Sequence, residues 1–310
     1  MTATRIGDAV LSTGLLAHLL KRLPGAEVTI ACGAPARSLF AEIPGLARVI
    51  VLNKRRIAGH WFAMWAELAR SRWDMAVDLR GSLLTHFLWR QAALVDRSAH
   101  PELHRVEELG RLAGIAPPDP VLWLSDAHRA AASNLVPDDR PVLAIGPAAN
   151  WPAKTWPIDR YVALMTRLTA PGAPLAGARV LVAAAPEERA QIAPLLQAIA
   201  PADLIDLTRG ADLLAIAACL ARARLYVGND SGLMHLAAAA GAPTLGLFGP
   251  SSDRRYRPWG AHAEFLRTPE PVAELMTRAR RGDLGPGALM ASLDLDAVEA
   301  AAVALLRRVR

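Results

Sequence analysis

The sequence predicts an α/β protein of two domains, each a doubly wound parallel sheet with helices on both faces. Short apolar runs, typical of buried strands, alternate with helical patterns along all 310 residues, and this βαβα order indicates parallel sheets. A chain of this length holds roughly two cores of about 100 to 200 residues each. A polar, proline-bounded stretch at 134–141 separates the two series. We therefore predict two Rossmann-like domains, 1–138 and 139–310, that face a central cleft, where ligands commonly bind.

The first half begins with a helix instead of a full strand. The apolar pattern predicts a helix over Ala9–Leu23, ended by Pro24 and Gly25. Only Met1–Thr4 precede the polar turn Arg5–Asp8, so the first strand is either very short or the chain starts a few residues late. Further strands are expected at Val28–Cys32, Val49–Leu52, Met75–Leu79 and Val121–Leu124.

In the second half, expected strands and helices alternate more regularly. Its expected strands are Val142–Ile145, Arg179–Ala184, Leu204–Leu207, Leu225–Val227 and Thr244–Phe248. Its expected helices are Ile158–Leu168, Glu187–Ala200, Asp212–Ala223 and Ala297–Arg308.

An Asp-X-Asp pattern, Asp294-Leu-Asp296, precedes the last helix. Such a pair holds a divalent metal in some transferases, but Asp296 and Glu299 also have the spacing of a capping box, which we favour. No other cluster of His, Cys, Asp or Glu has metal-ligand spacing. We predict no metal and no other cofactor.

The charge of the chain indicates an acidic partner. The chain is 53% hydrophobic and 21% charged, with a net charge of +6. Residues 1–111 hold 15 Lys and Arg against 10 Asp and Glu, a net of +5, so the first half carries most of the excess. Nucleic acid, an anionic membrane and an acidic substrate all attract such a surface. We do not expect nucleic acid, because no binding module is recognisable.

The sequence also favours a cytoplasmic protein. No apolar run reaches about 18 residues, the length that suggests a membrane-spanning helix, and no secretory leader is visible. Cys32 and Cys219 form neither a disulfide framework nor a metal motif, and both lie in apolar surroundings.

A basic run, Asn53–Arg56, is followed by an aromatic stripe at helical spacing. We interpret the run as a solvated turn and the stripe as core packing. The alternative is that both dock on an anionic lipid surface. The stripe comprises Trp61, Phe62, Trp65, Leu68 and Trp73.

The strongest candidate for a ligand site lies in Leu225–Pro250. This segment reads as a buried strand, a tight polar turn Asn229–Gly232, a helix of small residues and a second buried strand. Free N–H groups and the positive end of the helix dipole would point at a ligand there, as in phosphate sites. His235 lies one turn into the helix; a ligand contact and a satisfied core histidine are both open. A nucleotide diphosphate is the ligand that this arrangement favours.

Asp8 has two interpretations. It could project into the cleft as a general base, or it could cap the helix that follows. The spacing does not decide between them.

Two further segments of the second half carry charged candidates. The loop 146–157 holds Asn150 and Lys154 among prolines and tryptophans, and Lys154 could neutralise a diphosphate or be an ordinary surface lysine. Glu187 and Glu188 follow a strand, where a carboxylate can bind ribose hydroxyls or simply favour the first turn of a helix.

These motifs together resemble the heptosyltransferases of glycosyltransferase family 9. The resemblance lies in Arg5–Asp8, in Lys154-Thr-Trp-Pro157, in Val227–Ala239 and in Gly241–Pro250. It implies a GT-B fold, with the acceptor on the first domain and the nucleotide sugar on the second. It further implies inverting transfer of a heptose from ADP-heptose to the lipopolysaccharide inner core, of the Kdo-lipid A type, without an essential metal.

The resemblance also assigns roles to residues. It makes Asp8 the catalytic base, places Lys154 near the donor phosphates and Glu187, or else Glu188, at the nucleoside. The other expected donor residues are Asn150, Asp230, Ser231, Gly232 and His235.

The basic residues Arg5, Arg55 and Arg56 are expected to meet the acidic, lipid-linked acceptor, with peripheral contact at the inner face of the inner membrane. Two other functions stay open: a nucleotide-sugar epimerase on the same fold, and a nucleotide-sugar-binding protein without catalysis. The motifs of hydrolases, phosphoryl-transfer enzymes and dinucleotide-binding proteins are absent from the sequence.

Overall fold

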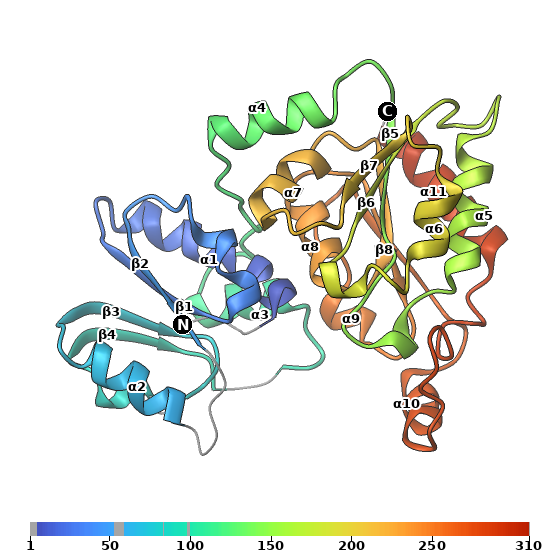
Figure 1. Cartoon of the computed structure of the whole chain (residues 1–310). Coiled ribbons are helices and arrows are strands. Elements are labelled where there is room, and N and C mark those ends of the chain that lie inside the picture. Colours follow the sequence, from blue (N-terminus) through green and yellow to red (C-terminus); the bar gives the residue numbers. More distant parts are fainter. Residues whose placement is uncertain (1–4, 53–58, 83, 98–99, 310) are drawn as a thin grey trace. The chain divides into compact units, whose positions relative to one another are not determined.

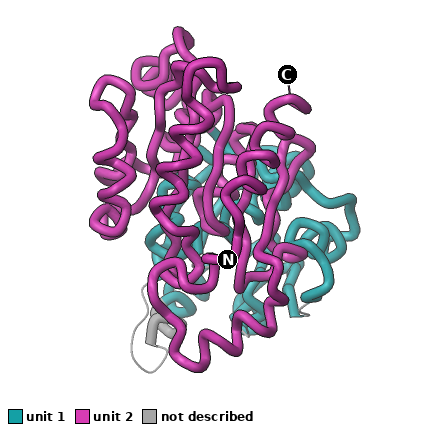
Figure 2. The backbone as a smooth tube through the Cα atoms, turned by 90° about the vertical axis from the view of Figure 1, so that its right-hand side faces the viewer, with its two compact units in different colours: residues 1–123 teal, residues 124–310 magenta. Residues whose placement is uncertain are grey.

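The computed structural model describes residues 5–52, 59–82, 84–97 and 100–309, with the backbone alone over 59–63 (Figure 1). The chain divides into two compact units, residues 1–123 and 124–310 (Figure 2). Helix α4 (Asp126–Leu135) belongs to the second unit because it packs on α7 (Leu213–Leu220). Just after α4, the Val136 carbonyl accepts a hydrogen bond from Arg222 at 2.5 Å. The boundary predicted at 138/139 falls after this helix.

Unit 1 contains two separate two-stranded parallel sheets within the described residues. One pairs β1 with β2 and the other pairs β3 with β4. Its elements are α1 (Ile6–Arg22), β1 (Val28–Cys32), β2 (Leu46–Val51), α2 (Gly59–Leu68), β3 (Trp73–Asp78), β4 (Arg90–Val95) and α3 (Arg105–Ala113).

The expected strand Val121–Leu124 was wrong. This segment forms no strand, and the Val121 amide donates to the Thr13 hydroxyl of α1 at 2.9 Å instead of to a sheet. Strand β4 was missed because it is polar at its start and no residue of it is fully buried, so it lacks the apolar run of a buried strand.

The core of unit 1 confirms part of the aromatic stripe as packing. Leu68 is buried in a cluster with Ala31 and Met64, and Trp65 and Trp73 pack against that cluster. The side chains of Trp61 and Phe62 and the run 53–56 lie outside the described residues.

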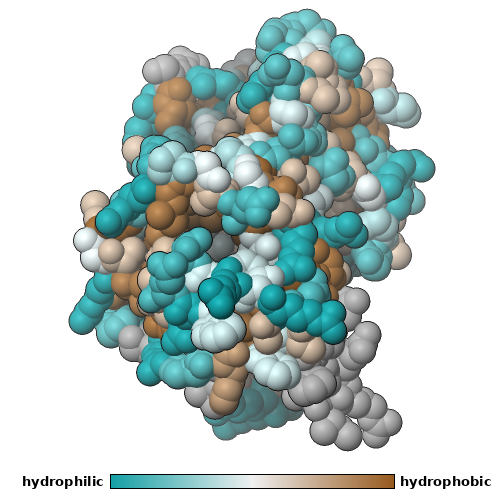
Figure 3. Space-filling model, turned by 90° about the vertical axis from the view of Figure 1, so that its left-hand side faces the viewer, coloured by the Kyte–Doolittle hydropathy of each residue, from teal (hydrophilic) through white to brown (hydrophobic). Residues whose placement is uncertain are grey.

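Two other aromatic side chains of unit 1 are exposed. Phe87 is 67% exposed and Trp89 70%, and the Arg72 guanidinium lies 4.9 Å from the centre of the Trp89 ring. On the face drawn in Figure 3, apolar residues are interspersed with polar ones. No helix in the described part of the chain is long and apolar enough to cross a membrane.

Unit 2 is built on one six-stranded sheet of order β10-β9-β8-β5-β6-β7, and every neighbouring pair is parallel. Its strands are β5 (Val142–Gly146), β6 (Arg179–Ala183), β7 (Leu204–Leu207), β8 (Leu225–Asn229), β9 (Thr244–Phe248) and β10 (Ala263–Arg267). Its other helices are α5 (Ile158–Thr169), α6 (Ala193–Ala198), α8 (Gly232–Ala239), α9 (Asp253–Tyr256), α10 (Val272–Arg280) and α11 (Leu295–Arg308).

Helices cover both faces of this sheet, as predicted (Figure 1). Alternate strand residues such as Leu143, Val182 and Leu225 point into a core shared with α5, α6 and α11. On the other face a Cβ at Gly246 would meet the Met234 sulfur of α8 at 2.5 Å. Such continuous burial explains why five strands of this unit could be read from apolar runs.

The helix expected over Glu187–Ala200 is interrupted. A 3₁₀ turn covers Pro186–Glu188, and α6 starts only at Ala193, with Pro194 in its first turn. Proline lacks an N–H and fits only the first turn of a helix, so one helix cannot run through this position.

The cap of the last helix is Asp294, not Asp296. The Asp294 carboxylate accepts from the amides of Asp296 and Ala297 at 3.1 Å each, while Asp296 pairs with Arg167 at 2.5 Å. No group of three metal-ligating side chains occurs among the described residues.

Candidate functional site

The candidate site lies where the strand order of unit 2 reverses. Read from β7, the order β7-β6-β5-β8-β9-β10 turns back between β5 and β8, the point at which parallel sheets of this type bind ligands. Gly146 and Gly228 are register partners near the carboxyl ends of these two strands. The loop with Lys154 leaves β5 there, and the loop with Asp230 leaves β8. The topology therefore brings together two motifs that are distant in sequence.

An ion pair joins the two loops. The Lys154 ammonium lies 3.1 Å from a carboxylate oxygen of Asp230, and the two side chains are only 14% and 12% exposed. Lys154 ends a 3₁₀ turn, Pro152–Lys154, that begins at a proline. An ammonium group held at this depth is suited to meet the negative charge of a diphosphate.

Asn229 plays a structural part that sequence reasoning missed. Its side chain is fully buried; its Nδ2 donates to the Pro147 carbonyl at 2.8 Å and its Oδ1 accepts from the Trp156 amide at 2.8 Å. It thus fastens both ends of the Lys154 loop to β8. The residue is the last of β8 and does not open the helix as predicted. Asn150 lies exposed in the same loop.

Helix α8 begins at Gly232, with Ser231 as its N-cap residue. The Ser231 hydroxyl accepts no hydrogen bond from the first turn. The first N–H groups of a helix have no acceptor within the helix itself. Together with the positive end of the helix dipole, they are suited to bind an anion beside the Lys154–Asp230 pair.

His235 is buried one turn into α8. Its side chain is 4% exposed, and its ring meets the ring of Tyr256 edge to face, with 6.5 Å between the centres. This burial is compatible with both interpretations of His235.

Glu187 and Glu188 share the 3₁₀ turn after β6 but differ in surroundings. The Glu188 carboxylate accepts from the Ala185 amide at 2.9 Å, and burial raises its pKa. Glu187 is exposed on the same turn. The geometry leaves Glu187 the better placed of the two for a ligand in solution.

A polar cluster at the end of β7 was not anticipated. Asp206 accepts from the Thr208 hydroxyl at 2.6 Å and pairs with Arg189 at 2.8 Å. Burial alone would raise the pKa of Asp206, but the hydrogen bonds from Thr208, Arg189 and Arg209 lower it to about 2. An Asp inside an otherwise apolar strand, two residues before a Thr, is the signal that could have indicated it.

In unit 1, the structure places Asp8 inside the first turn of α1. The N-cap is Arg5, whose side chain makes no cap, so the turn expected at Arg5–Asp8 was wrong, and Asp8 does not cap the helix, which was one of its two interpretations. A carboxylate in the first turn still interacts favourably with the helix dipole. Asp8 is half-buried and Arg5 is exposed. Arg55 and Arg56 lie outside the described residues.

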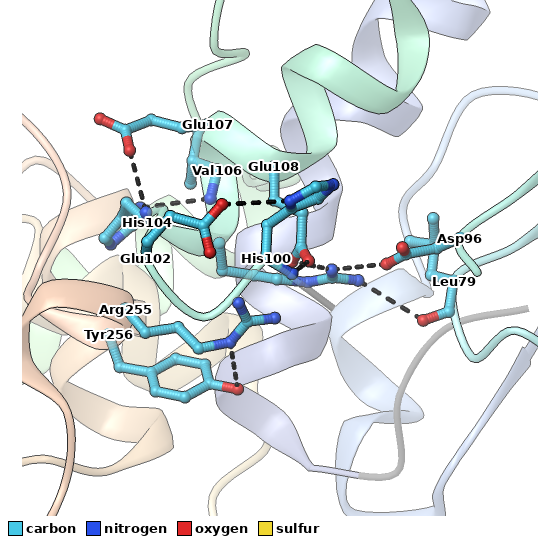
Figure 4. A network of polar contacts seen from close by, with 11 residues as sticks. Leu79, Asp96, His100, Glu102, His104, Val106, Glu107, Glu108, Arg255 and Tyr256 are labelled. Atoms are coloured by element: carbon cyan, nitrogen blue, oxygen red, sulfur yellow. Dashed lines mark hydrogen bonds and ion pairs between the residues drawn. The ribbon is translucent and has the colours of Figure 1, made fainter. Parts of the chain in front are cut away.

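Unit 1 also contains a buried charge network that the sequence did not reveal (Figure 4). Arg105 pairs with Asp96 at 2.6 Å and with Glu108, and donates to the Leu79 carbonyl at 3.4 Å. Glu108 in turn accepts from the His100 amide at 3.0 Å. The network fastens α3 to the carboxyl ends of β3 and β4.

Comparison with known proteins adds family information. The family model described as glycosyltransferase family 9 (heptosyltransferase) matches residues 100–281. Lipopolysaccharide heptosyltransferase 2 of Escherichia coli K12 is 26% identical over 337 aligned residues, covering 94% of this chain and 92% of the relative.

Two solved structures resemble the chain over nearly its full length. The family 9 glycosyltransferase of Veillonella parvula has a TM-score of 0.77 at 20% identity, covering 99% of this chain and 96% of its own. The E. coli ADP-heptose lipopolysaccharide heptosyltransferase II has a TM-score of 0.74 at 22% identity, covering 99% of both chains. These likenesses confirm the predicted α/β fold of the GT-B type.

Proposed function

Because the chain belongs to glycosyltransferase family 9 (heptosyltransferase), we propose that it is an inverting transferase that moves a heptose from ADP-heptose to the inner core of lipopolysaccharide, on an acceptor of the Kdo-lipid A type. The observation that carries the proposal is the half-buried Lys154 ammonium beside the open N-terminus of α8, at the reversal of the sheet order. The matched relatives are themselves named as lipopolysaccharide heptosyltransferases.

The donor would bind unit 2 through its diphosphate. Lys154 and the N–H groups at Ser231 and Gly232 would face the phosphates, Asp230 the sugar hydroxyls, and Glu187 the nucleoside. As the sugar leaves, negative charge grows on the diphosphate, so these donors act most strongly in the transition state. Asn150 and His235 complete the proposed donor contacts.

Asp8 is the proposed general base. It would take the proton of the acceptor hydroxyl while that oxygen attacks the anomeric carbon from the face opposite the diphosphate. The bond between the anomeric carbon and the phosphate oxygen breaks, and its electron pair leaves with ADP. We further propose that the two domains close on each other during the reaction, which would exclude water from the activated donor.

The acceptor side of the proposal rests on charge. The excess of basic residues in 1–111 would attract the carboxylates and phosphates of an acidic, lipid-linked saccharide, with Arg5, Arg55 and Arg56 as contacts. The exposed Phe87 and Trp89 beside Arg72 suit peripheral contact with the inner face of the inner membrane. The protein would therefore work in the cytoplasm.

The decisive experiment is a mass-spectrometric transfer assay. Purified protein is incubated with ADP-, UDP- and GDP-sugars and with core-truncated lipopolysaccharide, and we expect heptosylated acceptor only with ADP-heptose. Isomerised donor formed without acceptor would instead indicate an epimerase. Tight donor binding without any product would indicate a binding protein.

Two pairs of variants test the roles of the residues. Lys154→Ala should lower the turnover rate about 100-fold or more, as loss of an oxyanion donor does, whereas the exposed Lys21→Ala should not. Asp8→Asn should lower it about 100-fold or more, whereas Asp159→Asn, also in the first turn of a helix, should not. Turnover of Lys154→Ala or Asp8→Asn within a few-fold of wild type would refute that role.

A further inference from the structure

Helix α8 lacks a cap that its sequence could supply. A serine at the N-cap commonly accepts a hydrogen bond from the amide of the second or third helical residue. Ser231 does not, although it stands at the N-cap of α8. The other Ser and Asp residues at described helix N-caps of unit 2 all do so. They are Ser125, Asp212, Ser252 and Asp294.

The Ser231 hydroxyl is instead buried next to the phenol of Tyr226. Burial raises the pKa of Tyr226, and the adjacent Ser231 hydroxyl acts in the opposite direction. Tyr226 is 0% exposed. Within the part of the chain that the structure describes, neither the Tyr226 nor the Ser231 oxygen makes a hydrogen bond of normal geometry. Two buried hydroxyls thus sit together beneath the start of α8.

Two glycines fix the phenol in this place. A Cβ at Gly146 would lie 1.9 Å from the Tyr226 hydroxyl oxygen, and a Cβ at Gly228 would lie 2.4 Å from it. These glycines are register partners on β5 and β8. Because real Cβ atoms do not approach so closely, the space for the hydroxyl exists only while both positions lack a side chain.

We propose that Tyr226 is a positioning residue: its phenol, buried beside Ser231, offers the Ser231 hydroxyl an alternative to the first turn of α8 and so keeps the N–H groups of that turn open for the diphosphate of the donor. The inference rests on the proposed function, because it concerns the same anion site. An anion gains more from these amides than a hydroxyl does, since it also interacts with the helix dipole. A capping hydroxyl would have to be displaced before the anion could bind.

The test is a double-mutant cycle read by calorimetric binding of ADP. Tyr226→Phe frees Ser231 to cap α8, so ADP should bind about three- to tenfold more weakly. Ser231→Ala removes the hydroxyl that could cap, so adding Tyr226→Phe to it should change the affinity by less than twofold. Tyr161→Phe is the matched control: it removes another fully buried hydroxyl of unit 2 without a partner among the described residues, and should leave the affinity unchanged.

Thermal unfolding separates positioning from mere support of the fold. Tyr226→Phe should keep or raise the melting temperature, because it removes a buried unpaired hydroxyl and permits a cap. Weaker ADP binding together with an unchanged or higher melting temperature supports the proposal. An unchanged ADP affinity in Tyr226→Phe overturns it, and so does an equal loss of affinity in the Ser231→Ala background.

Inorganic pyrophosphate distinguishes failure of this inference from failure of the proposed function. If wild-type protein binds ADP or pyrophosphate but Tyr226→Phe binds them equally well, only the role of Tyr226 falls. If wild-type protein binds neither, the anion site and the role of Tyr226 fall together.

Discussion

The N-terminus of α8 differs from that of α7, although both helices follow a strand of the same parallel sheet and begin at a residue type that commonly caps. At α7 the Asp212 carboxylate accepts from the amides of Leu214 and Ala215, at 2.9 and 3.1 Å. At α8 the Ser231 hydroxyl accepts from no amide. The amides at the start of α7 are therefore capped by a side chain of the chain itself, and those at the start of α8 are not. Under the proposed function, the missing cap leaves the start of α8 open for an anion, at a cost of about 1 kcal/mol of stability.

The largest effect is expected when the N-cap of α8 is given a carboxylate, as the N-cap of α7 has. Ser231→Asp places a carboxylate at the α8 cap, and two unit charges about 4 Å apart at an effective dielectric constant of about 20 repel by about 4 kcal/mol. ADP affinity, measured by calorimetry, should fall about 100-fold or more while the melting temperature holds or rises. ADP binding within a few-fold of wild type would remove the contrast between the two helices.

Pyrophosphate should stabilise the wild-type protein by binding at the open start of α8. At a concentration of about 100 times its dissociation constant, a ligand that binds only the folded state adds about 2.7 kcal/mol to the free energy of unfolding. The measurement is urea unfolding with and without pyrophosphate. Ser231→Asp should abolish the gain and Asp212→Ala should keep it; a gain equal in wild type and Ser231→Asp would place the anion elsewhere.

Removing the N-cap of α7 should lower the stability of the protein and leave ADP binding unchanged. Asp212→Ala removes a cap of ordinary strength, so the free energy of unfolding should fall by about 1 kcal/mol. ADP affinity should stay as in wild type, because α7 is not part of the proposed site. A loss of ADP affinity without a loss of stability would show that the α7 start also serves the ligand.

The smallest effect concerns acid and the loop that leads to α7. The pKa of Asp206 is lowered to about 2 by its hydrogen bonds, against the effect of burial. Its contribution is therefore present above its unfolded pKa of about 3.9 and lost as the pH falls through about 2. Between pH 6 and pH 4, wild type should lose a few tenths of a kcal/mol at most relative to Asp206→Asn, after allowance for solvent screening. Equal acid titrations of the unfolding free energy would contradict this.

The contrast between the two helix starts also marks what could be predicted from sequence. Strand β9, which is buried along its whole length, was predicted with correct bounds, because nearly every residue is apolar. The exposed strand β4 was missed for the opposite reason. Local sequence patterns are a weak guide to a strand that is partly exposed to solvent in a small sheet.

The candidate site was predictable residue by residue but not as an assembly. Lys154 and Asp230 were each named from their motifs, yet their ion pair depends on how β5 and β8 become neighbours. Tyr226 looked like one more apolar residue of a strand. The role proposed for it depends on two glycines that lie on different strands and on a serine that does not cap.

The Lys154–Asp230 ion pair affects which ligands the site binds tightly. Because each charge already has a partner, a bare phosphate must draw the ammonium away and leave the carboxylate without compensation. An activated sugar offers both a diphosphate and hydroxyl donors, so it satisfies both members at once. After transfer, ADP has lost the sugar hydroxyls that are proposed to meet Asp230. Under the proposed function, ADP should therefore bind more weakly than the activated sugar, and product inhibition by ADP should be mild.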